Sequence, residues 1–169
     1  MKNTDRFYYL VEGACEKKII ETFKEQKNLI VSGKVIVFNA VQDRISPVFL
    51  RTIQDNTICI LVFDTDTANV DILEENIHKL QDNRKKVWLV LQVNNLEDEL
   101  VRCTDVSEVK YLTGSTTNSE FKHDLINEKR LFDKLMKHHF DFTKIWITRP
   151  DGVFRHFINE GQKIKRNTK

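Results

Sequence analysis

ICILVFDTD, residues 58–66, is the stretch that decides the fold. A short apolar run without polar alternation is typical of a strand buried on both faces, as in a parallel sheet. The run stops at Asp64 and Asp66, which are separated by one residue. Ligands of open α/β sheets bind beyond the carboxyl ends of the strands, and alternate strand residues point the same way. We therefore expect the two carboxylates to address one point.

Two carboxylates at one point imply a cation. Acids this close repel one another and raise one another's pKa unless a positive charge neutralises them. Ligation by oxygen alone suits Mg²⁺ or Mn²⁺, which we predict as the cofactor. The alternative is a solvated turn in which Asp66 or Thr67 caps the following helix.

Strand and helix patterns alternate along the rest of the chain. Apolar runs predict strands at residues 7–11, 35–38, 58–63, 87–91 and 144–147, and helical spacing predicts helices at 14–27, 47–54, 70–80 and 118–138. Such alternation favours an α/β fold with a mostly parallel central sheet and helices on both faces. We expect one catalytic domain over residues 1–150 and a basic C-terminal extension over 151–169.

Composition restricts the class of protein. With 169 residues, 40% of them hydrophobic and 31% charged, the chain has the make-up of a soluble globular domain. The net charge of +2 excludes a wholly basic nucleic-acid binder, so phosphate contacts would come from local patches. The candidates for such patches are Arg84, Lys85, Lys86, Lys163, Lys165 and Arg166.

Cysteine use and hydropathy indicate the compartment. Cys15, Cys59 and Cys103 are odd in number and lack a C-x-x-C spacing, which indicates reduced thiols. No apolar run approaches transmembrane length, and the first residues have no signal-peptide pattern. We expect a cytoplasmic protein without a membrane partner.

Acidic residues follow three of the predicted strands. Besides the aspartate pair, Glu12 and Glu16 follow the first strand, and the run 97–99 follows the fourth. If these strands are neighbours, their acids converge and can hold one or two divalent ions, as in-line phosphoryl displacement requires. Alternatively, Glu12 and the run Glu97, Asp98 and Glu99 only favour the positive N-termini of the next helices, and the choice within that run stays open.

These motifs resemble those of a known family. Val11-Glu12-Gly13-x-x-Glu16-Lys17 followed by Phe63-Asp64-Thr65-Asp66 is similar to the Toprim domain of topoisomerases, primases and related nucleases. The resemblance implies a Toprim-like fold in which Glu12, Asp64 and Asp66 bind metal and serve acid–base chemistry on a phosphodiester.

Two further features, the second glutamate Glu16 and the acidic motif Asn95-Leu96-Glu97-Asp98, resemble those of the overcoming-lysogenization-defect (OLD) nucleases. The resemblance covers residues 7–122 and implies further metal ligands at Glu16, Glu97 and Asp98, and a catalytic lysine at Lys122. It also suggests a role in phage defence. OLD proteins fuse this domain to an ATPase, but the chain has no G-x-x-x-x-G-K-[ST] loop. Whether the protein acts alone or with a separate ATPase partner stays open.

The leading functional hypothesis is a metal-dependent nuclease that hydrolyses DNA or RNA. Lys122 would stabilise developing charge, although a solvated helix lysine is the simpler interpretation. One alternative reads Asp64-Thr65-Asp66-Thr67 as the motif of haloacid-dehalogenase-like phosphatases, with Asp64 as nucleophile. Another is a non-catalytic module that binds nucleic acid or a partner ATPase. The sequence leaves the choice of DNA or RNA, the cleavage site and the oligomeric state open.

Overall fold

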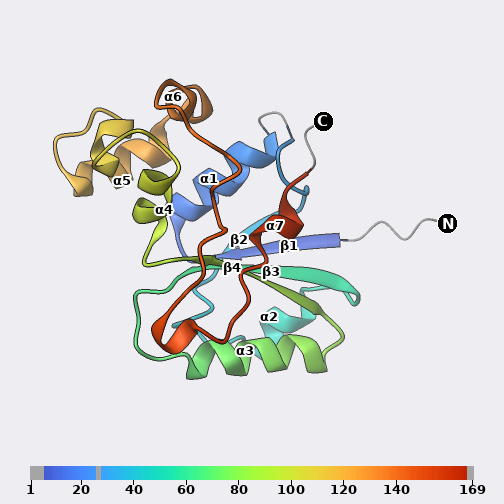
Figure 1. Cartoon of the computed structure of the whole chain (residues 1–169). Helices are drawn as coiled ribbons and strands as arrows, with labels where there is room; N and C mark the ends of the chain where they lie inside the picture. The colour runs from blue at the N-terminus through green and yellow to red at the C-terminus, as the bar shows by residue number, and fades with distance from the viewer. Residues whose placement is uncertain (1–5, 26–27, 167–169) are drawn as a thin grey trace.

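A computed structural model describes residues 6–25 and 28–166 and has a parallel sheet at its centre (Figure 1). All pairings among its four strands are parallel, and the strand order is β2-β1-β3-β4. The strands are β1 (Arg6–Val11), β2 (Lys34–Val37), β3 (Thr57–Asp64) and β4 (Lys86–Gln92). Every residue of β3 except Asp64 is buried, as the apolar run predicts. The predicted α/β fold with a parallel sheet is confirmed.

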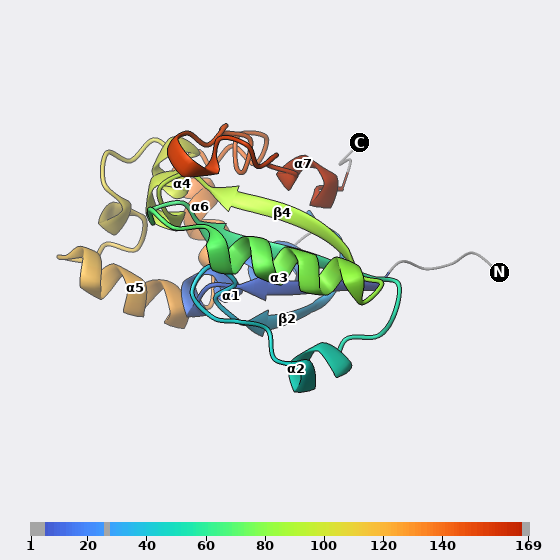
Figure 2. The same ribbon diagram turned by 90° about the horizontal axis from the view of Figure 1, so that it is seen from below.

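Helices cover both faces of the sheet (Figures 1 and 2). One apolar cluster packs between one face and four helices, and a second packs between the other face and two. The first group is α1 (Ala14–Glu25), α4 (Leu96–Arg102), α5 (Asn118–Asn127) and α6 (Leu131–Lys137); the second is α2 (Pro47–Arg51) and α3 (Asp71–Asp82). The short helices η1 (Val109–Leu112), η2 (Gly152–Phe154) and α7 (Gly161–Ile164) lie in the connections.

Helix boundaries follow the capping signals in most places. Ser46 caps α2 by accepting a hydrogen bond from the Phe49 amide, and Pro47 occupies the first helical position. The N-cap of α5 is Thr117, which forms a capping box with Glu120. Residues 26 and 27, at the predicted end of the first helix, lie outside the described residues.

The predicted single helix over residues 118–138 is wrong. The helix ends at Asn127, and α6 begins separately at Leu131. Glu128 takes an extended backbone with ψ 115°, which breaks the ladder of helical hydrogen bonds. Its carboxylate accepts from the amide of Arg130 and pairs with Lys134, so local polar contacts replace the missing helical turn.

The predicted strand over residues 144–147 is also wrong. Trp146 lies in the left-handed region with φ 57°, which no extended strand allows. Its amide donates to Glu99 Oε2 at 3.2 Å instead of to a neighbouring strand. The apolar side chains Ile145 and Trp146 are buried, so the burial that the pattern indicates is present without the strand.

The segment that follows runs around the β4 edge of the sheet (Figure 2). Phe154 enters the core cluster on the side of α3, and Ile164 enters the cluster on the side of α1. Side chains of this segment hydrogen-bond to the edge of β4. The Leu89 backbone amide donates to Glu160 Oε2 at 2.9 Å, and the Leu91 backbone amide donates to Asn159 Oδ1 at 3.3 Å. The described part of the expected extension, residues 151–166, thus packs against the domain; residues 167–169 lie outside the described chain.

Candidate functional site

A cavity of about 320 Å³ opens at the carboxyl ends of β1 and β3. This is the edge at which ligands of parallel α/β sheets bind. Loop and helix residues that follow β1 form one wall, and side chains from α4 and α5 form the other. The lining residues are Glu12, Gly13, Ala14, Cys15, Glu16, Asp64, Glu97, Lys122 and Ile126.

Asp64 lies at the centre of this arrangement. Its amide donates to Glu12 Oε2 at 3.0 Å, which ties the end of β3 to the end of β1. Its own Oδ1 is buried and has no hydrogen-bond partner. Burial, followed by the charges of Glu12, Glu16, Asp66 and Glu97, raises the pKa of Asp64 to about 9. The metal-free site therefore holds Asp64 protonated at neutral pH.

Glu16 adds a second buried carboxyl from the first turn of α1. Burial, together with the charges of Glu12 and Glu97, raises its pKa, although backbone hydrogen bonds oppose the shift. The carboxylate folds back over Gly13, where an added Cβ would lie 3.0 Å from Glu16 Oε2. A glycine at this position therefore leaves room for the acid.

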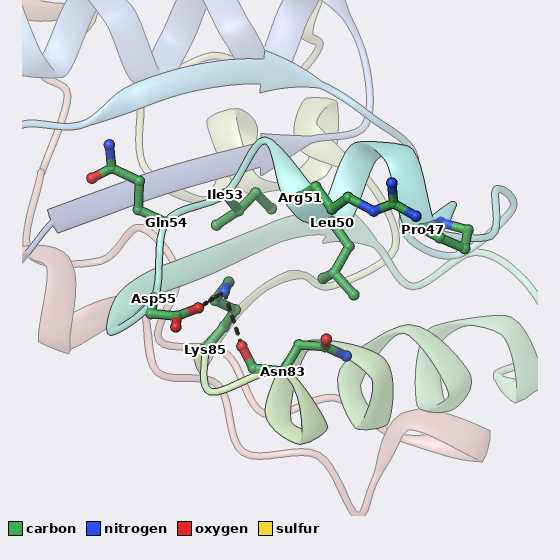
Figure 3. Close-up of a pocket in the computed structure, with 8 residues that line it drawn as sticks. All are labelled: Pro47, Leu50, Arg51, Ile53, Gln54, Asp55, Asn83 and Lys85. Atoms are coloured by element: carbon green, nitrogen blue, oxygen red, sulfur yellow. Dashed lines mark hydrogen bonds and ion pairs between the residues drawn. The ribbon is translucent and has the colours of Figure 1, made fainter.

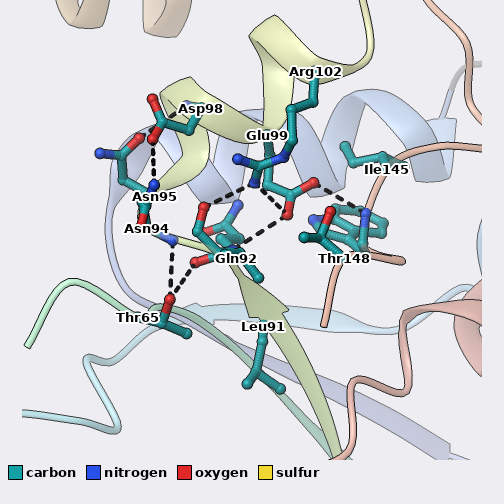
Figure 4. A network of polar contacts seen from close by, with 12 residues as sticks. Thr65, Leu91, Gln92, Asn94, Asn95, Asp98, Glu99, Arg102, Ile145 and Thr148 are labelled. Atoms are coloured by element: carbon teal, nitrogen blue, oxygen red, sulfur yellow. Dashed lines mark hydrogen bonds and ion pairs between the residues drawn. The ribbon is translucent and has the colours of Figure 1, made fainter. Parts of the chain in front are cut away.

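The three acids after β4 have three different environments. Asn95 caps α4 by accepting from the Asp98 amide, and this fixes where the first turn points. Glu97 lines the cavity, whereas Asp98 accepts from the Asn94 side chain at 2.8 Å. Glu99 is fully buried away from the cavity. It accepts from the backbone of Val93 and Trp146 and pairs with Arg102 (Figure 4).

Lys122 reaches the cavity from α5. Its Nζ lies 3.0 Å from Glu97 Oε1, and this hydrogen bond raises the pKa of the lysine. The side chain is still 61% exposed, so the ammonium faces solvent as well as the acid. The structure thus brings together Glu12, Glu16, Asp64, Glu97 and Lys122, as the motifs predict.

Asp66, the second residue of the predicted aspartate pair, lies outside the cavity lining. The strand ends at Asp64, so the alternation that was expected to aim both aspartates at one point stops before Asp66. Asp66 is exposed and is not part of the cavity lining, although its charge contributes to the raised pKa of Asp64. Its part in the site is therefore electrostatic in this arrangement.

Cys15 lies in the cavity, although the sequence indicated only a structural thiol. Its Sγ is 3.9 Å from the Lys122 carbonyl oxygen. Burial first, and then the surrounding acids, raise its pKa to about 11, so the thiol stays protonated and is a poor nucleophile. The available signal was its position directly before Glu16, on the first turn of the same helix.

The predicted basic patches are partly structural. Lys85 is buried and donates to Asp55 at 2.6 Å and to the Asn83 carbonyl at 2.9 Å, beside a cavity of about 410 Å³ (Figure 3). Lys165 donates to the carbonyl oxygens of Thr143 and Ile145, and burial lowers its pKa to about 8. These two ammonium groups are engaged within the protein rather than presented to phosphates.

The cavity has the donor chemistry for a hard divalent cation. Four carboxylates share the space, one of them with a buried, unpaired oxygen, and oxygen donors suit Mg²⁺ or Mn²⁺. As they stand within residues 6–25 and 28–166, no three His, Cys, Asp or Glu side chains are grouped tightly enough to hold a metal ion. The acids surround the cavity without converging on one point.

Comparison of the chain with protein-family models, curated proteins and solved structures finds no match. Across the described part of the chain, no helix has the length and apolar character needed to span a membrane. Inferences about function therefore rest on the site and on the motifs.

Proposed function

We propose that this protein is a divalent-metal-dependent nuclease of the Toprim type, which hydrolyses phosphodiester bonds of DNA or RNA. The observation that carries the proposal is the buried, unpaired oxygen of Asp64 in a cavity shared with three other carboxylates. Crowded acids without a counter-charge are costly, and a bound cation removes that cost. Glu12, Glu16, Asp64 and Glu97 would hold Mg²⁺ or Mn²⁺, which supplies an activated water and neutralises charge on the phosphate.

The chain's own residues supply the remaining chemistry. Glu12, fixed by the Asp64 amide, is placed to accept or return a proton at the cavity wall. Lys122 provides a positive charge that stabilises charge developing on phosphate oxygens. In the free protein its ammonium is paired with Glu97, so the same lysine balances the acids before substrate arrives.

The phosphatase hypothesis receives less support. It uses Asp64 as nucleophile and Asp66 as acid–base partner, yet Asp66 is exposed and outside the cavity lining. It also leaves Glu12 and Gly13 unexplained. A binding module without catalysis would use the same cavity, and only an activity measurement separates it from the nuclease.

The test is cleavage of plasmid DNA, single-stranded DNA and RNA in Mg²⁺ or Mn²⁺, with and without chelator. We expect metal-dependent cleavage of at least one polymer and none of a small phosphomonoester. Asp64→Asn protein, purified in the same way, controls for contaminating nucleases. Equal cleavage by this variant, or no cleavage of any polymer, would overturn the proposal, and phosphomonoester hydrolysis alone would favour the phosphatase.

A further inference from the structure

Gln92, the last residue of β4, is a buried amide that hydrogen bonding leaves unexplained. The residue is 0% exposed, and neither its Nε2 nor its Oε1 has a hydrogen-bond partner. A buried amide without partners is costly to the folded state, so such a group needs a specific explanation. No sequence pattern marks this burial, because a glutamine at a strand end looks like the start of a solvated loop.

The position of Gln92 supplies that explanation. Parallel pairing of β3 with β4 places Gln92 directly beside Asp64. Val62 and Val90, two residues earlier on the two strands, both belong to the core cluster on the side of α1. Because strand side chains alternate, Gln92 and Asp64 point to that same side. Two neighbouring side chains thus bury unpaired polar atoms: Nε2 and Oε1 of Gln92, and Oδ1 of Asp64.

We propose that Gln92 is a positioning residue of the cation site: when the ion binds, the Gln92 Nε2 donates a new hydrogen bond to Oδ1 of Asp64 and orients the carboxylate for the ion. This inference rests on the proposed function. Gln92 is absent from the cavity lining, so it acts through Asp64 and not on the ion. Acidic ligands are commonly held by such outer partners, and losing one costs about 10–100-fold in metal affinity.

The experiment compares Gln92→Met with wild type. Methionine has a similar length and no donor, so it removes the hydrogen bond together with the two unpaired polar atoms. We expect the metal-free variant to be at least as stable as wild type, while its Mg²⁺ or Mn²⁺ affinity, from the metal-induced shift in melting temperature, falls about tenfold or more. The metal concentration for half-maximal cleavage should rise equally, with turnover at saturating metal retained.

A matched control is Thr57→Val. Thr57 is 0% exposed, and its Oγ1 is also buried and unpaired, but it begins β3 at the opposite end from Asp64. Its removal should leave metal affinity unchanged. A wild-type affinity in Gln92→Met would overturn this inference alone, whereas the absence of any metal-induced shift in wild type would overturn the proposed function with it.

Should Gln92→Met fail to fold, side-chain amide resonances of the unaltered chain answer the same question. On addition of Mg²⁺ the Gln92 Nε2 protons should shift and exchange more slowly with solvent, as a new hydrogen bond requires. Resonances that do not respond to a bound ion would overturn the inference.

Discussion

Buried ionisable side chains have opposite surroundings at the two ends of the sheet. At the amino end, the ammonium of Lys85 is only 4% exposed and has two fixed partners, Asp55 and the Asn83 carbonyl (Figure 3). At the carboxyl end, the buried Oδ1 of Asp64 has none, and burial and the surrounding acids raise the pKa of its carboxyl. A buried charge with fixed partners is already satisfied within the fold. A buried acid without them is available to a ligand from solution, and that difference is the reason why we place the proposed site at the carboxyl end.

The largest expected effect comes from Asp64→Asn. Removing the central carboxylate should abolish the metal-induced rise in melting temperature, which for wild type corresponds to about 2.7 kcal/mol when the ion is at a hundred times its Kd. The metal-free variant should be as stable as wild type or more so, because asparagine is neutral without the costly uptake of a proton that Asp64 needs on folding. The measurement is thermal unfolding with and without Mg²⁺.

Asp82→Asn, at the exposed end of α3, is the control for the same substitution outside the cavity. It should keep the full metal response. A metal-induced shift in melting temperature of wild-type size in Asp64→Asn would contradict the proposal that the cation binds at the carboxyl end of the sheet.

Lys122→Met tests the positive side of the site. We expect turnover to fall by about a hundredfold, as for loss of one preorganised donor, while metal affinity persists. Metal affinity should not weaken, because Lys122 pairs with Glu97 in the free protein and its loss frees that acid. The checks are cleavage rates at saturating metal and metal titrations by thermal shift.

Lys129→Met, an exposed lysine beyond the end of α5, serves as the matched variant. Cleavage by Lys122→Met within a few-fold of this control would assign Lys122 to the ordinary solvated surface.

The pH dependence of stability should reveal the buried carboxyl at the carboxyl end of the sheet. The carboxyl pKa of Asp64 rises from 3.8 to about 9 on folding, so between these values the folded state binds a proton that the unfolded chain releases. Stability of the metal-free protein therefore falls as pH rises through this window. Denaturant unfolding in chelator at about pH 5 and about pH 8 should show a smaller loss in Asp64→Asn. An equal loss in both proteins would contradict the assignment.

Asp55→Ala should have the smallest effect on function and a clear effect on stability. It leaves the Lys85 ammonium buried with one partner fewer, so the melting temperature should fall while metal affinity stays at the wild-type value. Adding Lys85→Met should recover part of the loss, because no buried charge then remains. An unchanged melting temperature in Asp55→Ala would mean that the pair does not stabilise the amino end.

The sequence was sufficient where local pattern and burial agree. The apolar run of β3 and the signals at Ser46 and Pro47 predict elements that are present. It failed where a distant side chain decides the backbone: nothing near Trp146 shows that Glu99 accepts its amide and that a left-handed residue replaces a strand.

The candidate site divides in the same way. Strand ends predict that Glu12 and Asp64 lie close together, because parallel strands bring their carboxyl ends to one edge. Choosing Glu97 over Glu99 depends on how the Asn95 cap turns α4, and the outward position of Asp66 depends on where β3 stops. Both are settled by tertiary contacts that periodicity does not contain.

The sealed edge of β4 has a consequence for assembly. An exposed edge strand is a template on which another chain can add a strand. Asn159 and Glu160 occupy the backbone groups of Leu89 and Leu91, so recruitment of a neighbouring molecule at this edge would require the segment to detach first. Any intermolecular growth of the sheet is thereby directed to the other edge, β2, where both Lys34 and Val37 are exposed.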